Sequence, residues 1–247
     1  MSYVKDFAFW KSLSETNIVA IGSLVTEIRA HRLDLDRDEP HLFAMYQSHP
    51  NDPLQHDCRR EFLSGMISAL QHAALFYSSI LHLLTEERWW QQCALNYSKG
   101  EGELQVSDFA VNSKGGVFYM IAIQAEETMR LIVRSAPHAF TVDSTAELKS
   151  VYAHLLKVVG RQQYEPLFDI LRLTRNTIHN NGYHFSNGKI DKTIQYDGRT
   201  FSFLHAKPIT HADEEFIFKW LVKKLCEAHI DIVRTGVIRA IPACRRS

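Results

Sequence analysis

Two arginines, an asparagine and a histidine lie close together near the end of a predicted helix. They are Arg172, Arg175, Asn176 and His179. On an ideal helix, which turns by about 100° per residue, Arg172, Arg175 and His179 project from one flank. Arginine keeps its charge and offers a planar fork to phosphate oxygens, and histidine can take or give a proton near neutrality. This pattern therefore indicates chemistry on a phosphate group.

The same predicted helix carries an apolar stripe that would face the core. Its members lie within about 60° of one another around the helix axis. They are Leu167, Leu171, Thr174 and Ile178, with Ile170 beside them. Because the arginine and histidine flank adjoins this stripe, we expect the flank at the margin between core and solvent.

A purely structural role is the main alternative for these polar residues. Structural networks of arginine and histidine perturb titratable groups as functional sites do. Arg172 could pair with Asp169, three residues earlier, and Arg175 with an acidic residue elsewhere. The Asn-Asn-Gly run at 180–182 could be no more than a helix cap.

An earlier predicted helix could supply acidic partners for this cluster. It carries four charged residues, which are Glu126, Glu127, Arg130 and Arg134. They could form an ordinary exposed face with pairs at i, i+4 spacing. Glu127 is the preferred candidate for orienting Arg175 or His179 from that helix.

The stretch from Leu173 to Gly182 reads LTRNTIHNNG, and its RNxIHNNG pattern resembles the signature helix of the HEPN superfamily. The resemblance implies an all-helical domain that is frequently dimeric. Many members of that superfamily are metal-independent endoribonucleases in defence and toxin systems. The family motif is an arginine, usually followed by a polar residue such as asparagine, and then a histidine after four to six residues.

The resemblance implies roles for individual residues of this chain. His179 matches the catalytic histidine, and Asn176 matches the polar neighbour of the arginine. Arg175 directly precedes Asn176, with three residues between it and His179. Arg172 has six residues between it and His179 and is followed by Leu173. Arg175 thus has the polar neighbour but fewer intervening residues than the motif, and Arg172 has the spacing but an apolar neighbour, so each arginine meets one of the two requirements.

RNA cleavage without a metal or cofactor is the activity that the resemblance implies. His179 would act as general base or acid on a ribose 2′-hydroxyl, and Arg175 or Arg172 would stabilise the charge of the phosphorane. The products would be a 2′,3′-cyclic phosphate and a 5′-hydroxyl. A homodimer is expected, because a second chain would supply the second histidine for two proton transfers. The candidate substrate-binding residues are Asn180, Asn181, His184 and Glu127.

Other catalytic and metal-binding patterns are weak in this chain. GxSxG, P-loop and HExxH motifs are absent. His179 and His184 lack a nearby third ligand, so we expect no zinc site. His56, Asp57 and Cys58 are adjacent in sequence, and adjacent side chains of a helix or strand point apart, so this trio is interpreted as incidental.

Composition limits the partners and the compartment. Lys and Arg together equal Asp and Glu at 28 each, so only a local patch could attract a polyanion such as RNA. The four cysteines are far apart in the sequence, which favours a reduced, cytoplasmic protein. The longest apolar stretches, near 66–84 and 118–133, are interrupted by polar residues, so we expect no membrane span and no membrane partner.

The helical period of apolar residues predicts an all-α fold. The predicted helices cover about 15–31, 59–84, 86–97, 116–135, 144–159, 165–180 and 210–238. Charged, proline-containing connections are expected at 34–40 and 49–53, and a loop at 98–102. Ser144 is the expected N-cap of its helix, with Glu147 as its capping-box partner.

One inserted β-hairpin is expected near residues 190–204. Residues alternate there with a period of two around Asp197 and Gly198, and Asp-Gly between β-formers is a strong hairpin signal. We expect a single helical domain over 1–247, in which N-terminal helices in 1–100 pack on a HEPN-like core in 110–240. A short basic tail follows at 241–247.

Two functions from different classes remain open. The first is an endoribonuclease in a bacterial defence or toxin–antitoxin setting, with a protein antitoxin as a further partner. The second is a non-catalytic helical module that binds a nucleotide, an RNA or a protein with the same surface. In a third interpretation the cluster is only structural.

Overall fold

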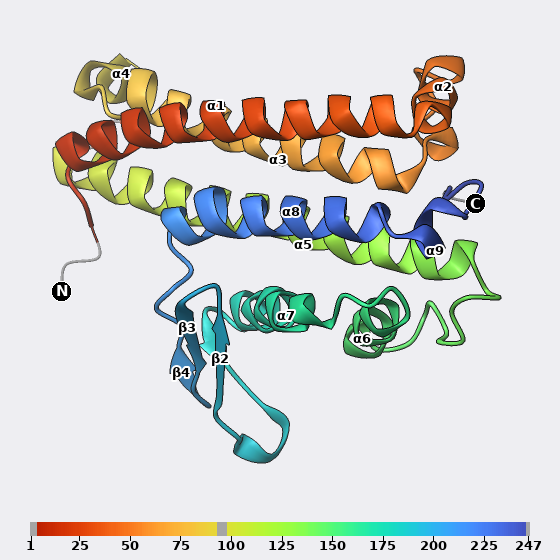
Figure 1. Ribbon diagram of the computed structural model, residues 1–247. Helices are drawn as coiled ribbons and strands as arrows, with labels where there is room; N and C mark the ends of the chain where they lie inside the picture. The colour runs from red at the N-terminus through yellow and green to blue at the C-terminus, as the bar shows by residue number, and fades with distance from the viewer. Residues whose placement is uncertain (1–3, 93–97, 246–247) are drawn as a thin grey trace.

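Long helices arranged in three layers make up most of the molecule (Figure 1). The computed structural model describes residues 4–92 and 98–245. From top to bottom in Figure 1, the layers are α1 (Phe7–Asp38) with α3 (Cys58–Ser79), α5 (Lys99–Ser135) with α8 (Val222–Val233), and α6 (Leu148–Val158) with α7 (Glu165–His179). Helices account for 71% of the structure, which confirms the predicted helical class.

Shorter helical elements connect the layers. The short α-helices are α2 (Pro40–Ser48), α4 (Glu87–Gln92) and α9 (Gly236–Arg239). Two π-helical segments, Ile80–Leu84 and Phe216–Leu221, continue α3 and lead into α8. Single 3-10 turns lie at Pro53–Gln55, Gln162–Tyr164 and Asn187–Lys189.

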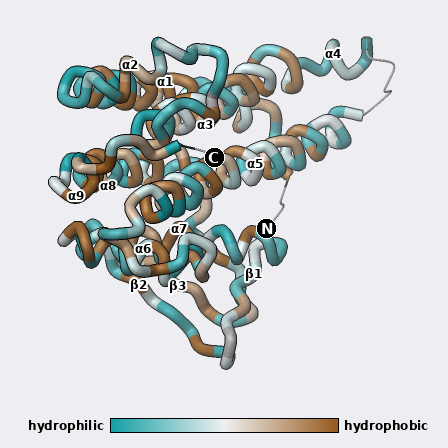
Figure 2. Tube along the Cα trace, turned by 90° about the vertical axis from the view of Figure 1, so that its right-hand side faces the viewer, coloured by the Kyte–Doolittle hydropathy of each residue, from teal (hydrophilic) through white to brown (hydrophobic). Residues whose placement is uncertain are grey.

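The segment Cys58–Leu84, made of α3 and its π-helical continuation, is a central element of the fold. By length and composition alone it could cross a membrane, and it is the one such candidate among the described residues. Its Leu63, Met66 and Leu70 are fully buried, and it packs against both α1 and α5. Hydrophobic and hydrophilic residues alternate around the long helices (Figure 2), as in helices that bury one face. This packing places the buried face of the segment in the core of the bundle.

The predicted loop at 98–102 is wrong, because Ser98 begins α5. The Ser98 hydroxyl accepts from the Glu101 N–H at 3.4 Å, and the Glu101 carboxylate accepts from the Ser98 N–H at 2.7 Å. This capping box supports a first turn that contains two glycines. A Cβ atom at Gly102 would lie 3.1 Å from the Phe7 ring, so that glycine lets α1 approach closely.

Two further N-terminal boundaries differ from the sequence prediction. α1 begins at Phe7, where the Asp6 carboxylate accepts from the Phe9 N–H at 2.7 Å. The expected connection after residue 34 is largely helical, since α1 extends to Asp38 and Pro40 opens α2. Proline suits the first turn of a helix, because an N–H there has no helical partner.

Ser144 is not the N-cap of α6. The N-cap is Glu147, which forms no side-chain cap bond. The backbone carbonyl of Ser144 instead accepts a hydrogen bond of 2.5 Å from Arg130 of α5. The segment that precedes α6 is therefore held against α5.

The other predicted ends differ by a few residues. α4 covers Glu87–Gln92, and the rest of the predicted 86–97 helix falls at 93–97, outside the described residues. The final predicted helix at 210–238 is divided into a π-helical segment, α8 and α9. Asp213 accepts from the Phe216 N–H at 2.8 Å and so marks where this helical run starts.

The predicted hairpin is confirmed. β2 (Lys192–Tyr196) pairs antiparallel with β3 (Arg199–Phe203). Asp197 and Gly198 have φ angles of 54° and 71°, and two positive values are typical of the type I′ turn favoured in two-residue hairpins. A second pairing joins β1 (Tyr183–His184) to β4 (Lys207–Pro208), so the hairpin region begins directly after α7.

Buried side chains from all three layers form one hydrophobic cluster, which extends from Phe7 to Cys244. α5 passes through the expected boundary between 1–100 and 110–240. The division of residues 1–247 into N-terminal helices and a HEPN-like core stays a prediction.

Candidate functional site

The end of α7 positions the polar cluster. Leu167, Ile170 and Thr174 are fully buried, so the predicted apolar stripe faces the core. The helix ends at His179, and the Gly182 N–H returns to the Thr177 carbonyl at 2.9 Å. Asn181 and Gly182 have φ angles of 55° and 85°, as in helix ends closed by a left-handed turn.

Arg175 faces α5, where it forms an ion pair with Glu126. The same Glu126 carboxylate accepts two bonds from Arg130, at 2.9 and 2.8 Å. Arg130 also donates to the carbonyls of Ser144 and Ala146 at 2.5 and 2.8 Å. One carboxylate therefore ties the flank of α7 to α5 and to the loop before α6.

Arg175 lines a surface hollow of about 580 Å³. Its charged lining comprises Arg130, Arg134, Arg175, Glu126 and Glu127. Three arginines against two glutamates leave the hollow with one excess positive charge, which suits an anionic ligand. Glu127, which the sequence favoured as the partner of Arg175, lines the hollow, but the ion pair with Arg175 comes from Glu126.

His179 lies exposed at the end of α7 and also faces α5. Its ring meets the ring of Tyr119 edge-on, with centroids 5.3 Å apart. Arg175 and His179 are one turn apart on α7, and their partners Glu126 and Tyr119 are two turns apart on α5. The arginine and the histidine therefore share one side of the helix, and the imidazole is open to solvent.

Arg172 points to a different neighbourhood, between α6 and the hairpin. It donates to the Asp169 carboxylate at 3.2 Å and to the Tyr152 hydroxyl at 3.4 Å. Asp169 also accepts from Tyr152 and from Lys192 of β2, the latter at 2.5 Å. Burial opposes the ionisation of Asp169, but the bonds from Lys192 and Tyr152 outweigh it, so the pKa of this carboxyl is lowered. The sequence offered two structural pairings, Arg172 with Asp169 and Arg175 with an acidic residue elsewhere, and the structure shows both.

A second hollow, of about 520 Å³, opens beside Arg172. Asn176, His184 and Lys192 also line it. His184 is buried, with its Nδ1 3.4 Å from the Thr177 hydroxyl. Burial, then the nearby charges of His205 and Arg172, lower the pKa of His184, which keeps the imidazole neutral near pH 7.

The predicted site residues thus occupy three places. Arg175 and Glu127 line the first hollow, and Arg172, Asn176 and His184 line the second. His179, Asn180 and Asn181 are exposed at the end of α7. Sequence reasoning placed both arginines on one flank, but their neighbours are on different elements, and it missed the role of Glu126. No spacing in the sequence singles out Glu126, because the choice between Glu126 and Glu127 depends on how α5 is rotated against α7.

Comparison of the chain with family models, with curated proteins and with solved structures finds no match in any of the three. The structure places the RNTIHNNG stretch in the last turns of α7 and in the turn that follows. The likeness of this stretch to the HEPN signature helix stays a prediction.

Proposed function

We propose that this protein is a metal-independent endoribonuclease in which His179 moves protons and Arg175 binds the reacting phosphate. The observation that carries the proposal is the shared orientation of the two residues on α7. Arg175 lines a hollow with excess positive charge, and the exposed imidazole of His179 lies one turn away. A phosphate held at Arg175 would bring an adjacent ribose within reach of that imidazole.

Arg175 fits this role better than Arg172. The Arg175 side chain is 30% exposed and that of Arg172 is 16% exposed. Arg172 also binds Asp169 and Tyr152 on the side of the helix toward α6. The arginine nearer to His179 in sequence is therefore the one that supports catalysis.

The reaction would begin when His179 takes the proton of a ribose 2′-hydroxyl. The O2′ atom then attacks phosphorus, and the Arg175 guanidinium stabilises the negative charge of the phosphorane. Glu126 would hold the guanidinium fork in place. The departing 5′-oxygen needs a proton, which His179 of a second copy would supply in a homodimer. The products are a 2′,3′-cyclic phosphate and a 5′-hydroxyl.

A cleavage assay with fluorescently labelled single-stranded RNA, in the presence of EDTA, tests this function. The wild-type protein is expected to cleave the RNA and His179→Ala to lose cleavage. The matched control is His72→Ala, which removes an exposed histidine of α3. Equal cleavage by His179→Ala and the wild-type protein, in samples of equal thermal stability, would refute the proposal.

A second candidate function is a non-catalytic module that binds a nucleotide, an RNA or a protein. The observation that favours it is the polar hollow at Arg172, with Asn176, Lys192 and His184 in its lining. This function predicts saturable binding of RNA or nucleotide that is lost in Arg172→Ala, with no turnover.

The proposed setting is the cytoplasm, in a defence or toxin–antitoxin system with a protein partner. The cysteines described by the structure, Cys58, Cys226 and Cys244, are all free thiols, which suits a reducing compartment.

A further inference from the structure

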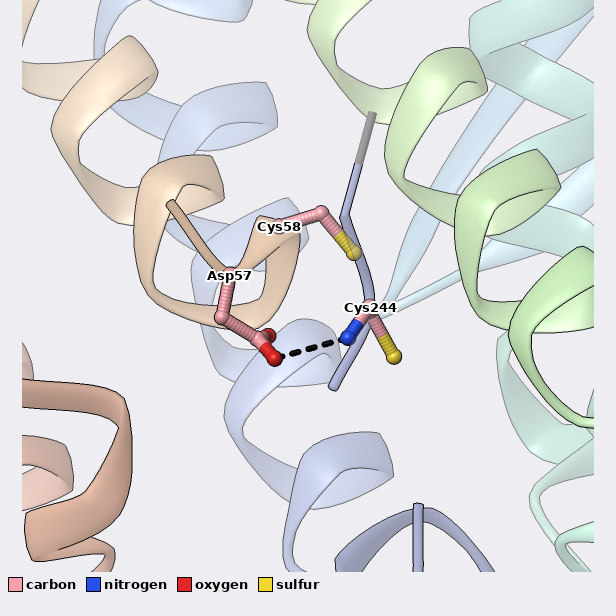
Figure 3. A group of neighbouring side chains, drawn as sticks. All are labelled: Asp57, Cys58 and Cys244. Atoms are coloured by element: carbon pink, nitrogen blue, oxygen red, sulfur yellow. Dashed lines mark hydrogen bonds between the residues drawn. The ribbon is translucent and has the colours of Figure 1, made fainter. Parts of the chain in front are cut away.

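Two buried thiols meet where the C-terminal tail reaches the start of α3. Cys58 is the first residue of α3, and Cys244 lies in the tail after α9 (Figure 3). Their sulfur atoms and a carboxylate oxygen of Asp57 all lie within 4.8 Å of one another. The Cys58 N–H donates to the Cys244 carbonyl at 2.8 Å, and the Cys244 N–H donates to Asp57 at 2.8 Å. The two backbones are therefore joined directly at this point.

Both carboxylate oxygens of Asp57 are already occupied by hydrogen bonds, so Asp57 does not suit a metal ion. Its Oδ1 accepts from the Arg59 N–H and Nε at 3.0 and 2.8 Å. Its Oδ2 accepts from Arg59 Nη2 and the Cys244 N–H at 2.7 and 2.8 Å. Structural zinc sites use four ligands, and without this carboxylate only the two thiols remain of the trio. The group is better described as a dithiol.

We propose that Cys58 and Cys244 form a reversible disulfide, with a hydroperoxide as the oxidant. The two sulfur atoms, within 4.8 Å of each other, must approach to about 2.05 Å in the bond. The Cys58 N–H bond to the Cys244 carbonyl already holds the two backbones side by side. This site is independent of the proposed ribonuclease function.

A third hollow, of about 290 Å³, gives the oxidant access to the Cys58 side of the dithiol, next to the fully buried Cys244. Cys58 lines this hollow together with His56, Glu61 and Gln124. Buried thiols are ordinarily unreactive, but here one of the pair borders a space that admits a molecule as small as hydrogen peroxide.

The two thiols differ in acidity, which assigns their roles. The hydrogen bond from Cys58 lowers the pKa of Cys244, against the effect of burial. Burial, followed by the interaction with Cys244, raises the pKa of Cys58. Cys244 is therefore the more acidic thiol of the pair and the one that more readily loses its proton.

The oxidation proceeds in two steps. The Cys244 thiolate attacks one oxygen of hydrogen peroxide, which forms an S–O bond and breaks the O–O bond. The departing oxygen takes the Cys58 proton and leaves as water. The Cys58 thiolate then attacks the Cys244 sulfur, forms the S–S bond and releases hydroxide, which takes a proton from solvent. The sulfurs lose two electrons and the peroxide gains them.

The disulfide would link α3 to a C-terminal tail that hydrogen bonds from Arg59 already hold in place. Arg59 Nη1 donates to the carbonyls of Ile238 and Ile241 at 3.0 and 2.9 Å. A link between residues 58 and 244 closes most of the chain into a loop, which restricts the unfolded state. Oxidised protein is therefore expected to melt about 5 °C or more above reduced protein.

Intact-mass and peptide analysis of the full-length protein tests the proposal. Folded protein is treated with hydrogen peroxide, unfolded in denaturant that contains N-ethylmaleimide, and digested with trypsin. The intact mass, measured before alkylation, should fall by about 2 Da as two thiol hydrogens leave. Trypsin should then release peptide 38–59 linked to peptide 240–245, with the link and the gain in melting temperature both lost on reduction.

Cysteine variants test whether the link is specific to Cys58 and Cys244. Cys93→Ser combined with Cys226→Ala leaves Cys58 and Cys244 as the only cysteines of the chain, and this variant should still form the link. Cys244→Ser should form none. The proposal is overturned if folded protein keeps both thiols open to alkylation after peroxide, if another pair is linked, or if the link forms only in denaturant. Should Cys244→Ser fail to fold, the two-cysteine variant carries the test.

Discussion

Arg175 and Arg172 are three residues apart, yet their side chains contact different elements of the fold. Arg175 binds Glu126 on α5, and Arg172 binds Asp169 and Tyr152 toward α6. Each guanidinium already has a carboxylate partner, so the residue type alone does not reveal which one meets a phosphate. For the proposed function, accessibility and the side shared with His179 favour Arg175.

Replacing the two arginines one at a time separates their roles. Arg175→Ala should lower the rate of RNA cleavage about 100-fold or more, because a charge that stabilises the phosphorane is lost. Its effect on stability should be below about 1 kcal/mol, since the Arg175–Glu126 pair is partly exposed. Arg172→Ala should retain cleavage and lose about 1–3 kcal/mol of unfolding free energy, because Asp169 loses a buried partner.

Single-turnover cleavage rates and urea unfolding curves of the two variants measure these effects. Arg175→Lys is the control that keeps the charge and removes the fork. If Arg172→Ala abolished cleavage while Arg175→Ala left it intact, the assignment of the arginines would be reversed.

Pairwise contacts within α7 could be predicted from its sequence, whereas contacts to other elements could not. The buried stripe and the Arg172–Asp169 pair follow from the helical period. The choice between Glu126 and Glu127 does not, because neighbouring residues on a helix differ by about 100° in direction. Which of them meets Arg175 depends on how α5 is rotated against α7, and that is fixed by packing of the whole bundle.

The ends of the helices and strands also show which features could be predicted from the sequence. Asp-Gly set the hairpin turn locally, so the hairpin could be predicted to within two residues. The glycines at 100 and 102 suggested a loop, but the Ser98–Glu101 capping box and the contact of Gly102 with Phe7 sustain a helix. For the start of this helix, the N-cap residue is therefore a better predictor than the glycines that follow it.

Removing the cap of α5 should destabilise the protein measurably. Ser98→Ala deletes the hydroxyl that accepts the Glu101 N–H, which should cost about 1 kcal/mol of unfolding free energy. Ser113→Ala, in the interior of the same helix, is the control and should cost nothing, because alanine is the better helix former. A fall in the urea midpoint that is no larger for Ser98→Ala than for Ser113→Ala would show that the cap contributes little.

Two histidines with lowered pKa values, the buried His229 and the partly buried His211, link the stability of the whole molecule to pH. Burial lowers the pKa of His229, which packs on Phe62 and bonds the Arg59 carbonyl at 2.6 Å, to about 4. Burial also lowers the pKa of His211, among the aromatic rings of the hairpin and α8 region, to about 4. In the unfolded chain a histidine titrates near pH 6.5. Between these two values the unfolded state binds more protons, so acid favours unfolding.

The wild-type protein should therefore lose stability as pH falls from 7 to 5. His229 should account for roughly 2 kcal/mol of that loss. Urea midpoints measured at pH 7, 6 and 5 test this, with His229→Gln giving a flatter dependence and the exposed His72→Gln leaving it unchanged. An equal slope in wild-type and His229→Gln protein would contradict the assignment.

The central claim, that His179 acts on a ribose 2′-hydroxyl, is tested most directly with two labelled strands of one sequence. One is RNA, and the other carries a 2′-O-methyl group on every ribose. Each is incubated in EDTA with wild-type protein and with His179→Ala, and the product ends are identified by mass spectrometry. Only RNA with wild-type protein is expected to be cleaved, leaving 2′,3′-cyclic phosphate ends. Cleavage of the methylated strand, or cleavage of RNA by His179→Ala at the wild-type rate, would contradict this claim.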